Sequence, residues 1–361
     1  MLKIGIVGLP NVGKSTLFNA LTDASVLAAN YPFATIEPNT GIVPVPDERL
    51  ENLAKIYKSN KIIPATVEFV DIAGLVAGAS KGEGLGNKFL SNIRECDAIC
   101  HVVRAFDNAK IQRADGQNYS DNIIDLAKKD IEIITTELAL ADISTIENHL
   151  PKVAREAKAN PKLRAKVDYL TSLQNELLAG KIPNNFNQEF LNDLQLLTAK
   201  SVIYLFNVDE NNLTNQAFQN QLRETVFPAK SVFICAELES EIRELSAVES
   251  AELLADYGVK ESSLSLLAQT AYETLGLQSY LTAGEKEVRA WTIHRGWTAP
   301  QAAGVIHTDF EKGFIAAQII DYDDLISAGS ESAARAAGKI RTEGKIYIMQ
   351  PNDVVEFRFN V

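Results

Sequence analysis

Near the start of the chain stands the sequence Gly8-Leu9-Pro10-Asn11-Val12-Gly13-Lys14-Ser15-Thr16, which matches the pattern G-x-x-x-x-G-K-[ST] at every fixed position. In such a loop, successive backbone N–H groups surround the α- and β-phosphates of a nucleotide. The lysine reaches the β- and γ-phosphate oxygens, and the serine hydroxyl binds Mg²⁺. Residues 2–7 form an apolar run suited to a buried parallel strand, and residues 15–22 predict an amphipathic helix. A strand, a phosphate loop and a helix N-terminus in this order predict a nucleotide-binding α/β domain.

The composition is that of an ordinary globular protein. The 361 residues allow two or three domains, with 46% hydrophobic and 23% charged residues. The net charge of −12, from 35 basic and 47 acidic residues, argues against nucleic-acid binding through overall charge, although it allows a local basic patch. The three cysteines form no CxxC pair and the four histidines show no metal-ligand spacing, so we expect reduced thiols and no structural zinc site.

The sequence shows no sign of membrane targeting. The first predicted strand begins directly after Met1, which leaves no room for a signal peptide, and no apolar run approaches ~18 residues. We therefore expect a cytoplasmic protein without a membrane partner.

Two further stretches carry residue types that sense a nucleotide. The proline-rich stretch 30–39 contains Thr35, which we expect to bind Mg²⁺ and to sense the γ-phosphate. The alternating run 65–70 ends in Asp71-Ile72-Ala73-Gly74, where Asp71 would hold Mg²⁺ through a water and the Gly74 amide would bond the γ-phosphate. The glycine-rich residues that follow predict a segment whose conformation the γ-phosphate sets.

Leu75 departs from the pattern of common GTPases. Many of them place a glutamine directly after this glycine, where it orients the attacking water. A leucine side chain makes no hydrogen bond, so another group must position the water. We therefore predict slow intrinsic hydrolysis that a partner accelerates.

The stretch Asn207-Val208-Asp209-Glu210 bears on base selection. GTP-specific proteins carry Asn-Lys-x-Asp after the corresponding strand, but here Val208 replaces the lysine and Glu210 the aspartate. The extra methylene moves the carboxylate ~1.3 Å outward and would strain its bonds to guanine. Asn207 and nearby backbone groups could instead read the edge of adenine, so we expect ATP to be preferred over GTP.

The remaining strands complete the predicted fold. Apolar runs at 98–103, 201–206 and 231–234 alternate with helical stretches, which predicts a doubly wound, mostly parallel sheet with the ligand at the carboxyl ends of its strands. His101 lies within one of these runs, and we interpret it as a satisfied strand histidine. The side-chain oxygen of Asn11 could hold a monovalent cation such as K⁺ beside the phosphates, although a loop asparagine that bonds only the backbone fits equally well.

Between residues 103 and 201 the pattern is helical. Residues 121–150 carry apolar side chains at helical spacing, and Asn160-Pro161 predicts the capped start of a second helix, so the two form an antiparallel pair. Basic residues gather near the turn between them and could contact a phosphate backbone, although a solvated charged face is an equal alternative: Lys152, Arg155, Lys158, Lys162, Arg164 and Lys166.

The last part of the chain predicts a small α+β domain. It would contain, in chain order, a hairpin at 280–283 and 287–293, a helix at 299–306, a strand at 315–320, a helix at 332–338 and end strands at 345–349 and 354–359. It contains no catalytic constellation, so we expect it to bind a partner.

Taken together, these motifs resemble the YchF, or Obg-like ATPase, family of P-loop NTPases. The resemblance spans the chain and rests on the phosphate loop, on Asp71-Ile72-Ala73-Gly74-Leu75, on Asn207–Glu210 and on residues 307–314, His-Thr-Asp-Phe-Glu-Lys-Gly-Phe. It implies a nucleotide domain at 1–120 and 198–275, a coiled-coil insertion at 121–197 and a β-grasp TGS domain at 277–361.

The resemblance also implies a function. A member of this family would be a monomer that hydrolyses ATP with Mg²⁺, associates with the ribosome or its 50S subunit and RNA, and acts in translation or oxidative stress. The nucleotide would contact Asn11, Val12, Gly13, Lys14, Ser15, Thr16, Asn207, Val208 and Glu210, and Mg²⁺ would contact Ser15 and Thr35. Some members use a histidine in the loop after the fourth strand to position water, but Arg113 stands there in this chain. An Obg-type GTPase, and an RNA-binding module with incidental hydrolysis, remain the alternatives.

Overall fold

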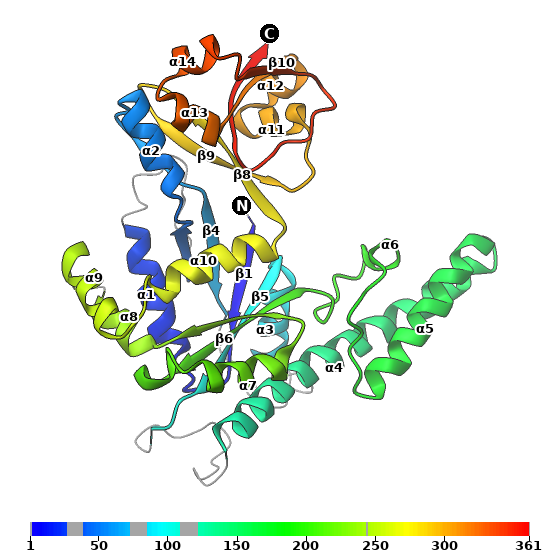
Figure 1. Ribbon diagram of the computed structural model, residues 1–361. Coiled ribbons are helices and arrows are strands. Elements are labelled where there is room, and N and C mark those ends of the chain that lie inside the picture. The colour runs from blue at the N-terminus through cyan, green and yellow to red at the C-terminus, as the bar shows by residue number, and fades with distance from the viewer. Residues whose placement is uncertain (1, 27–38, 73–84, 109–121, 243–244, 361) are drawn as a thin grey trace. The chain divides into compact units, whose positions relative to one another are not determined.

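The computed structural model describes residues 2–26, 39–72, 85–108, 122–242 and 245–360. The chain divides into two compact units (Figure 1). Unit 1 consists of Met1–Asp23, Ile36–Gly41 and Glu68–Leu264, and unit 2 of Ala24–Thr35, Ile42–Val67 and Ser265–Val361.

The first six-stranded sheet carries the phosphate loop. Its strand order is β2-β4-β1-β5-β6-β7, and β1 pairs in parallel with β4 and β5, as β6 does with β5 and β7. Because the strands are parallel, the carboxyl ends of β1, β4, β5 and β6 meet at one edge of the sheet. The strands are β1 Lys3–Val7, β2 Thr40–Pro44, β4 Thr66–Asp71, β5 Ala98–Ala105, β6 Ser201–Val208 and β7 Lys230–Ile234.

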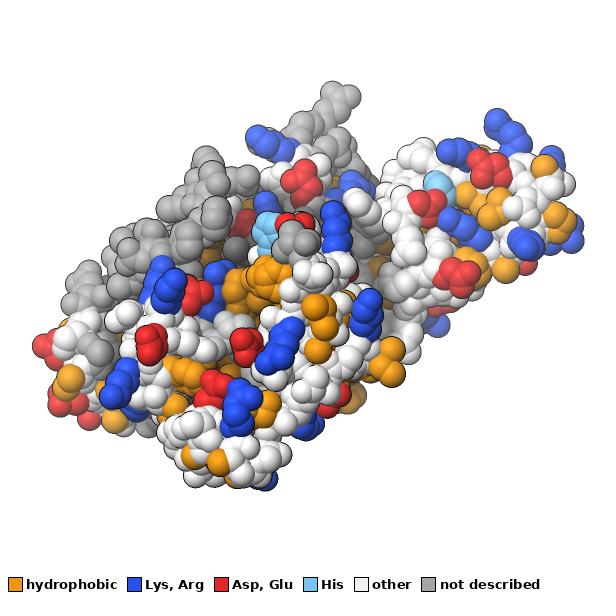
Figure 2. All heavy atoms as spheres, turned by 90° about the horizontal axis from the view of Figure 1, so that it is seen from above, with side chains coloured by type: hydrophobic (Ala, Val, Ile, Leu, Met, Phe, Trp, Pro, Cys, Tyr) orange, Lys and Arg blue, Asp and Glu red, His pale blue; other side chains and the backbone are white. Residues whose placement is uncertain are grey.

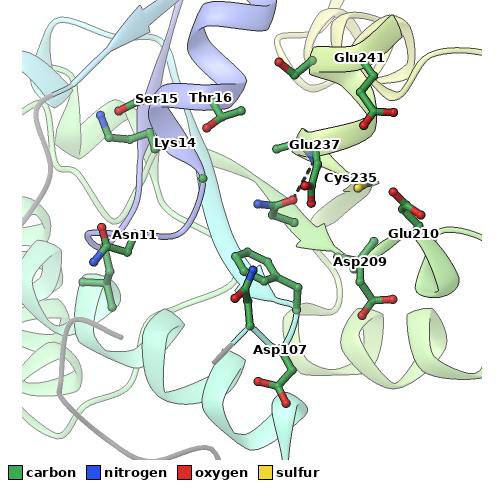
Figure 3. Close-up of a pocket in the computed structure, with 18 of the residues that line it drawn as sticks. Asn11, Lys14, Ser15, Thr16, Asp107, Asp209, Glu210, Cys235, Glu237 and Glu241 are labelled. Carbon is green, nitrogen blue, oxygen red and sulfur yellow. Dashed lines mark hydrogen bonds between the residues drawn. The ribbon is translucent and has the colours of Figure 1, made fainter. Parts of the chain in front are cut away.

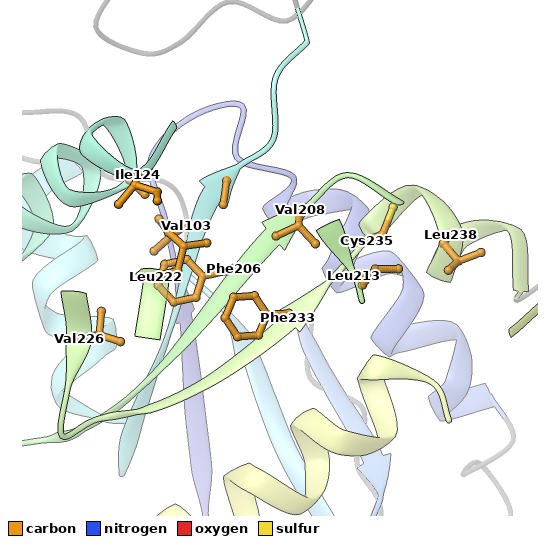
Figure 4. Packing of buried hydrophobic residues seen from close by; sticks show 12 residues of the cluster. Val103, Ile124, Phe206, Val208, Leu213, Leu222, Val226, Phe233, Cys235 and Leu238 are labelled. Carbon is orange, nitrogen blue, oxygen red and sulfur yellow. The ribbon is translucent and has the colours of Figure 1, made fainter. Parts of the chain in front are cut away.

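Both faces of this sheet are covered. Every residue of the central strand β5 is buried, as expected for a parallel strand between two layers. One face packs Val103, Phe206 and Phe233 against side chains from α4 and α7, among them Ile124 and Leu222 (Figure 4). The helices of unit 1 are α1 Lys14–Val26, α3 Leu85–Arg94, α4 Ile123–Ala157, α5 Arg164–Leu178, α6 Gln188–Leu191, α7 Gln216–Val226, α8 Ala236–Ile242 and α9 Ala247–Asp256.

Helices α4 and α5 form a projecting arm with a hydrophobic seam of its own (Figure 1). The side-chain Oδ1 of Asn160 accepts from the backbone amide of Lys162 and so caps the 3₁₀ turn η2 Pro161–Leu163 that leads into α5, as the sequence predicts. The first helix is longer than predicted, because it continues through Pro151 to Ala157. An interior proline costs a helix about 3 kcal/mol, and burial of the following Val153 offsets part of that cost. The seam contains Ala139, Ile143, Ile146, Leu170, Leu173, Leu177, Leu191, Leu194 and Leu196.

Unit 2 contains a second six-stranded sheet of order β11-β10-β12-β8-β9-β3. β8 and β12, the first and last strands of the C-terminal segment, lie side by side in parallel, and β9 and β10 flank them in antiparallel pairs. With α11 packed on β9 and β10, this is the β-grasp arrangement that the family resemblance implies. The strands are β3 Ile62–Ile63, β8 Leu277–Ala283, β9 Val288–His294, β10 Phe314–Asp321, β11 Ile340–Glu343 and β12 Asp353–Phe359. The helices are α2 Glu48–Tyr57, α10 Ser263–Thr274, α11 Ala299–Ile306, α12 Thr308–Lys312, α13 Tyr322–Ala328 and α14 Glu331–Ala336.

One segment joins a different unit from the one its sequence position suggests. We expected residues 1–120 in the nucleotide domain, but Ile42–Val67 clusters with the C-terminal segment. Arg49 donates to the carbonyl of Pro351 at 2.6 Å, Ser59 donates to the carbonyl of Gly284 at 2.6 Å, and β3 extends the second sheet by pairing with β9. These contacts join residues that are far apart in the sequence, so no local sequence pattern predicts them.

The predicted strand at 345–349 is wrong. Its residues make a single bridge, between Ile348 and Thr298, and the edge strand beside β10 is β11, earlier in the chain. The run is apolar, but Ile346 is 91% exposed and Ile348 is 50% exposed, so these side chains are not packed as in a strand of the sheet.

Among the helices of the described residues, none combines the length and the apolarity that a membrane crossing requires.

Candidate nucleotide-binding site

The phosphate loop connects the end of β1 to the start of α1. Gly13 has φ +94° and Asn11 φ +63°, a backbone region that residues with a side chain rarely adopt. A Cβ on Gly8 would lie 2.9 Å from the carbonyl oxygen of Val102 and from the side chain of Val12. The glycines of the motif are therefore required by the path of the chain itself.

Asn207, at the end of β6, fastens this loop. Its Nδ2 donates to the carbonyl of Val12 at 3.0 Å, and its Oδ1 accepts from the amide of Ala236 at 3.1 Å. The side chain is 6% exposed and lies directly against Gly13. Through these two bonds Asn207 ties the phosphate loop to the start of α8. That its side-chain amide also recognises adenine stays a prediction.

Lys14 and Asp71 meet across the sheet edge. The Lys14 ammonium donates to the Asp71 carboxylate in an ion pair, and both residues line the cleft together with Ser15. A serine hydroxyl and one carboxylate are the few protein oxygens that Mg²⁺ uses when phosphates and water complete its shell. The described part of the chain contains no group of three or more His, Cys, Asp or Glu that could hold a metal ion. Thr35, Gly74, Leu75 and Arg113 lie outside the described residues.

A cleft of about 1310 Å³ extends from the phosphate loop along the sheet edge (Figure 3). Lys14, Ser15 and Thr16 lie at one end, and Asp209, Glu210 and the side chains of α8 lie at the other. This volume accommodates a nucleotide. The cleft is lined by Leu9, Pro10, Asn11, Gly13, Lys14, Ser15, Thr16, Asp71, Phe106, Asp107, Asn108, Asn207, Val208, Asp209, Glu210, Asn211, Cys235, Ala236, Glu237, Ser240 and Glu241.

The end of the cleft away from Lys14 is acidic and held in place. Asp209 caps the 3₁₀ turn η3 Glu210–Asn212, accepting from the amide of Asn212 at 3.1 Å. The Glu210 carboxylate raises the pKa of the Tyr257 phenol. Glu210 stands at this acidic end of the cleft, where a GTP-specific protein has an aspartate for guanine.

Several residues of the cleft did not stand out in the sequence. Phe106, Ser240 and Glu241 belong to no motif. Phe106 directly follows the end of the buried parallel strand β5, and that position is the signal that could have found it.

His101, Cys96 and Cys100 do not line this cleft, whereas Cys235 does. His101 is buried within β5, burial lowers its pKa to about 3, and its Nε2 has no hydrogen-bond partner within the described ranges. It is a core histidine as predicted, but it is not satisfied. Burial raises the pKa of Cys96 to about 11 and that of Cys100 to about 12, and all three cysteines are free and buried, as expected.

Comparison with known proteins gives matches over the full chain. It is 51% identical over 367 residues to a protein of Pasteurella multocida and 46% identical over 371 residues to one of Bacillus subtilis, with at least 99% of each chain covered. Both are named "Ribosome-binding ATPase YchF". The chain belongs to the YchF family.

Other matches agree with the YchF assignment. The Schizosaccharomyces pombe YchF GTPase structure superimposes with a TM-score of 0.86 at 39% identity, covering 99% of this chain and 97% of that one. A Pyrococcus horikoshii GTP-binding protein, with a TM-score of 0.62 and 20% identity over 99% of this chain and all of that one, shares the fold. Residues 3–138 match the family model described as "50S ribosome-binding GTPase". Residues 277–360 match YchF-GTPase_C, described as "Protein of unknown function (DUF933)".

Proposed function

We propose that this protein is a cytoplasmic, monomeric ATPase that binds ATP and Mg²⁺ in the cleft and acts as a nucleotide-dependent switch on the ribosome. The observation that carries the proposal is the cleft itself, with a strained phosphate loop at one end and Glu210, in place of a guanine-reading aspartate, at the other. The name of the full-length relatives supports the same function.

The phosphate end is assigned from the loop. Backbone amides of residues 11–16 would hold the α- and β-phosphates, and Lys14 would exchange Asp71 for the β- and γ-phosphate oxygens. The Gly74 amide would bond the γ-phosphate. Asn11 lines the cleft and is the candidate for K⁺.

The donor set fits Mg²⁺. Ser15 and Asp71 line the same end of the cleft, and Thr35 would supply the third protein oxygen. When bound, Mg²⁺ neutralises charge on the β- and γ-phosphates. The chain's own contribution is to place these oxygens and to keep Lys14 beside them.

The base end supports ATP over GTP. A guanine-reading acid must accept two bonds from the base, and here the side chain of Glu210 is longer by one methylene, which would strain those bonds. Val208, which is 2% exposed, offers no charge in place of the lysine of GTPases.

Leu75 and Arg113 bear on the hydrolysis rate. Neither a leucine nor an arginine is a good group for activating water, so we propose slow intrinsic turnover that the ribosome accelerates. Arg113 could still stabilise charge on the γ-phosphate.

The arm offers a contact for RNA of the large, 50S subunit. Figure 2 shows Lys and Arg side chains gathered on the outer end of the arm. Lys166 is paired with Asp193 at 2.8 Å and so contributes less. Phosphate contacts of this kind release counterions, which makes binding salt-dependent. The exposed or half-exposed basic residues near the arm's turn are Lys152, Arg155, Lys158, Lys162 and Arg164.

Hydrolysis on ribosomes tests the proposal. The Lys14→Ala protein should lose ATP turnover with and without ribosomes, whereas Lys55→Ala, which removes an exposed lysine on α2, should turn over like wild type. If Lys14→Ala cycled normally on ribosomes, the protein would be an RNA-binding module. If wild type hydrolysed GTP but not ATP, it would be an Obg-type GTPase.

A further inference from the structure

Arg104 lies near the end of β5. Its side chain is among the largest that are fully buried, and it is 1% exposed. Its Nη2 donates to the carbonyl of Asn108 at 3.2 Å and its Nε to the carbonyl of Phe106 at 3.4 Å. Its Cζ lies 4.5 Å from the centre of the Phe106 ring. Arginine is almost never fully buried unless its charge is compensated, so such a side chain calls for a structural or functional reason.

The groups that Arg104 holds form one wall of the nucleotide cleft. Phe106, Asp107 and Asn108 all line it, and two of these three residues are bonded to Arg104 through their backbone carbonyls. A guanidinium is planar and presents its N–H groups as a rigid fork, so it fixes two carbonyls and one ring face at the same time. We call residues 106–108 the β5 wall.

The strand register places the β5 wall at the base end of the cleft. Arg104 pairs with Asn207 and Ala105 with Val208, so Phe106 follows at the level of Asp209. In Figure 3, Asp107 lies on the side of Asp209, away from Lys14 and Ser15. The wall therefore borders the segment assigned to the base, and not the γ-phosphate.

We propose that Arg104 is a positioning residue that sets nucleotide affinity by fixing the β5 wall. It does not touch the nucleotide. The inference rests on the proposed function, because it needs a nucleotide in this cleft. It assigns to a buried residue a role in binding the nucleoside part, common to ATP and ADP.

The substitution Arg104→Lys isolates this role. A lysine keeps the positive charge but has one ammonium and no plane, so it cannot bridge both carbonyls and cover the ring. We expect the dissociation constants for ATP and ADP to rise alike, by about tenfold, which corresponds to about 1.4 kcal/mol. The kcat at saturating ATP should stay within about twofold of wild type, because the wall does not border the γ-phosphate.

A matched control is available on α7. The guanidinium of Arg223 lies 4.8 Å from the centre of the Phe233 ring and donates to Asn220 and Gln219, but Arg223 does not line the cleft. Arg223→Lys therefore removes a similar set of contacts. It should alter the melting temperature without changing the affinity for either nucleotide.

A double-mutant cycle tests whether Arg104 acts through the wall. If it does, Arg104→Lys should weaken ATP binding less in a Phe106→Leu background than in wild type. Full additivity of the two substitutions would overturn the proposal.

The remaining outcomes also decide it. Unchanged affinity in a folded Arg104→Lys protein, a loss of kcat at unchanged affinity, or a chain that no longer folds would each overturn the proposal. Wild type is titrated alongside. If wild type itself bound no nucleotide, the proposed function would fail instead, so the two failures are distinguishable.

Discussion

At the scale of single residues, the site is built by side chains that hold backbone. Asn207 bonds the phosphate loop and the start of α8, and Arg104 bonds the carbonyls of the β5 wall. Both stand at the ends of buried parallel strands. The cleft is thus shaped by polar groups that are themselves nearly inaccessible to solvent.

His101 gives a pH dependence whose sign follows from its burial. Its native pKa of about 3 lies below the ordinary value of 6.5, so below pH 6.5 the unfolded chain binds a proton that the native chain does not. The free energy of unfolding should therefore fall as the pH drops from 6.5 toward 3. Above pH 6.5 the contribution of His101 to it should stay constant.

The measurement is urea unfolding at pH 7 and pH 5. The free energy of unfolding should fall by about 2 kcal/mol more between pH 7 and pH 5 in wild type than in His101→Leu, because leucine binds no proton. Equal losses in the two proteins would show that His101 is protonated in the native state.

Part of the site follows from sequence, and the reason is local. The phosphate loop is predictable because nine consecutive residues carry its geometry, and Asp71 and Asn207 because each ends an apolar run. The β5 wall is not, since it depends on the contacts of Arg104, which no spacing encodes.

At the scale of elements, one buried carboxylate anchors the arm. Asp142 on α4 is fully buried and accepts from the amide of Leu197 at 2.8 Å and from the amide and hydroxyl of Thr198 at 2.7 Å each. These bonds tie the arm to the segment that leads into β6.

Removal of this carboxylate should be costly. Asp142→Ala leaves three donors of the 197–198 segment without their acceptor, and we expect a loss of about 2–4 kcal/mol in the free energy of unfolding. Asp168→Ala, on α5 and outside any buried cluster, is the control and should cost less than about 0.5 kcal/mol. Similar unfolding midpoints for the two variants would contradict the anchor.

The elements predicted correctly are those with a strong local pattern. β5 and β6 are continuous apolar runs, and α11 Ala299–Ile306 has Pro300 at its start. The predicted strand at 345–349 was wrong because an apolar run alone does not provide a pairing partner. The long helix α4 continues through Pro151 because packing of the residues beyond it outweighs the free-energy cost of an interior proline.

At the scale of the whole molecule, the second unit is completed by residues from the first fifth of the chain. Leu50, Leu53 and Ile63 are buried, and Asn52 and Tyr57 bond Tyr322 and Glu331. The domain bounds expected from the sequence stay a prediction, and the packing assigns 42–67 to unit 2.

A fragment experiment tests this assignment. Residues 265–361 expressed alone lack α2 and β3, so we expect a poorly dispersed ¹H–¹⁵N spectrum and a broad thermal transition. A fragment with sharp, native-like resonances and cooperative unfolding would show that the segment is dispensable.

The central claim is that this cleft holds an adenine nucleotide. Titration calorimetry of the full chain with ATP and with GTP, each with Mg²⁺, tests it most directly. The account predicts that ATP binds with the lower dissociation constant. Guanine nucleotide preferred by about tenfold or more, a difference of about 1.4 kcal/mol, or no binding of either nucleotide, would contradict it.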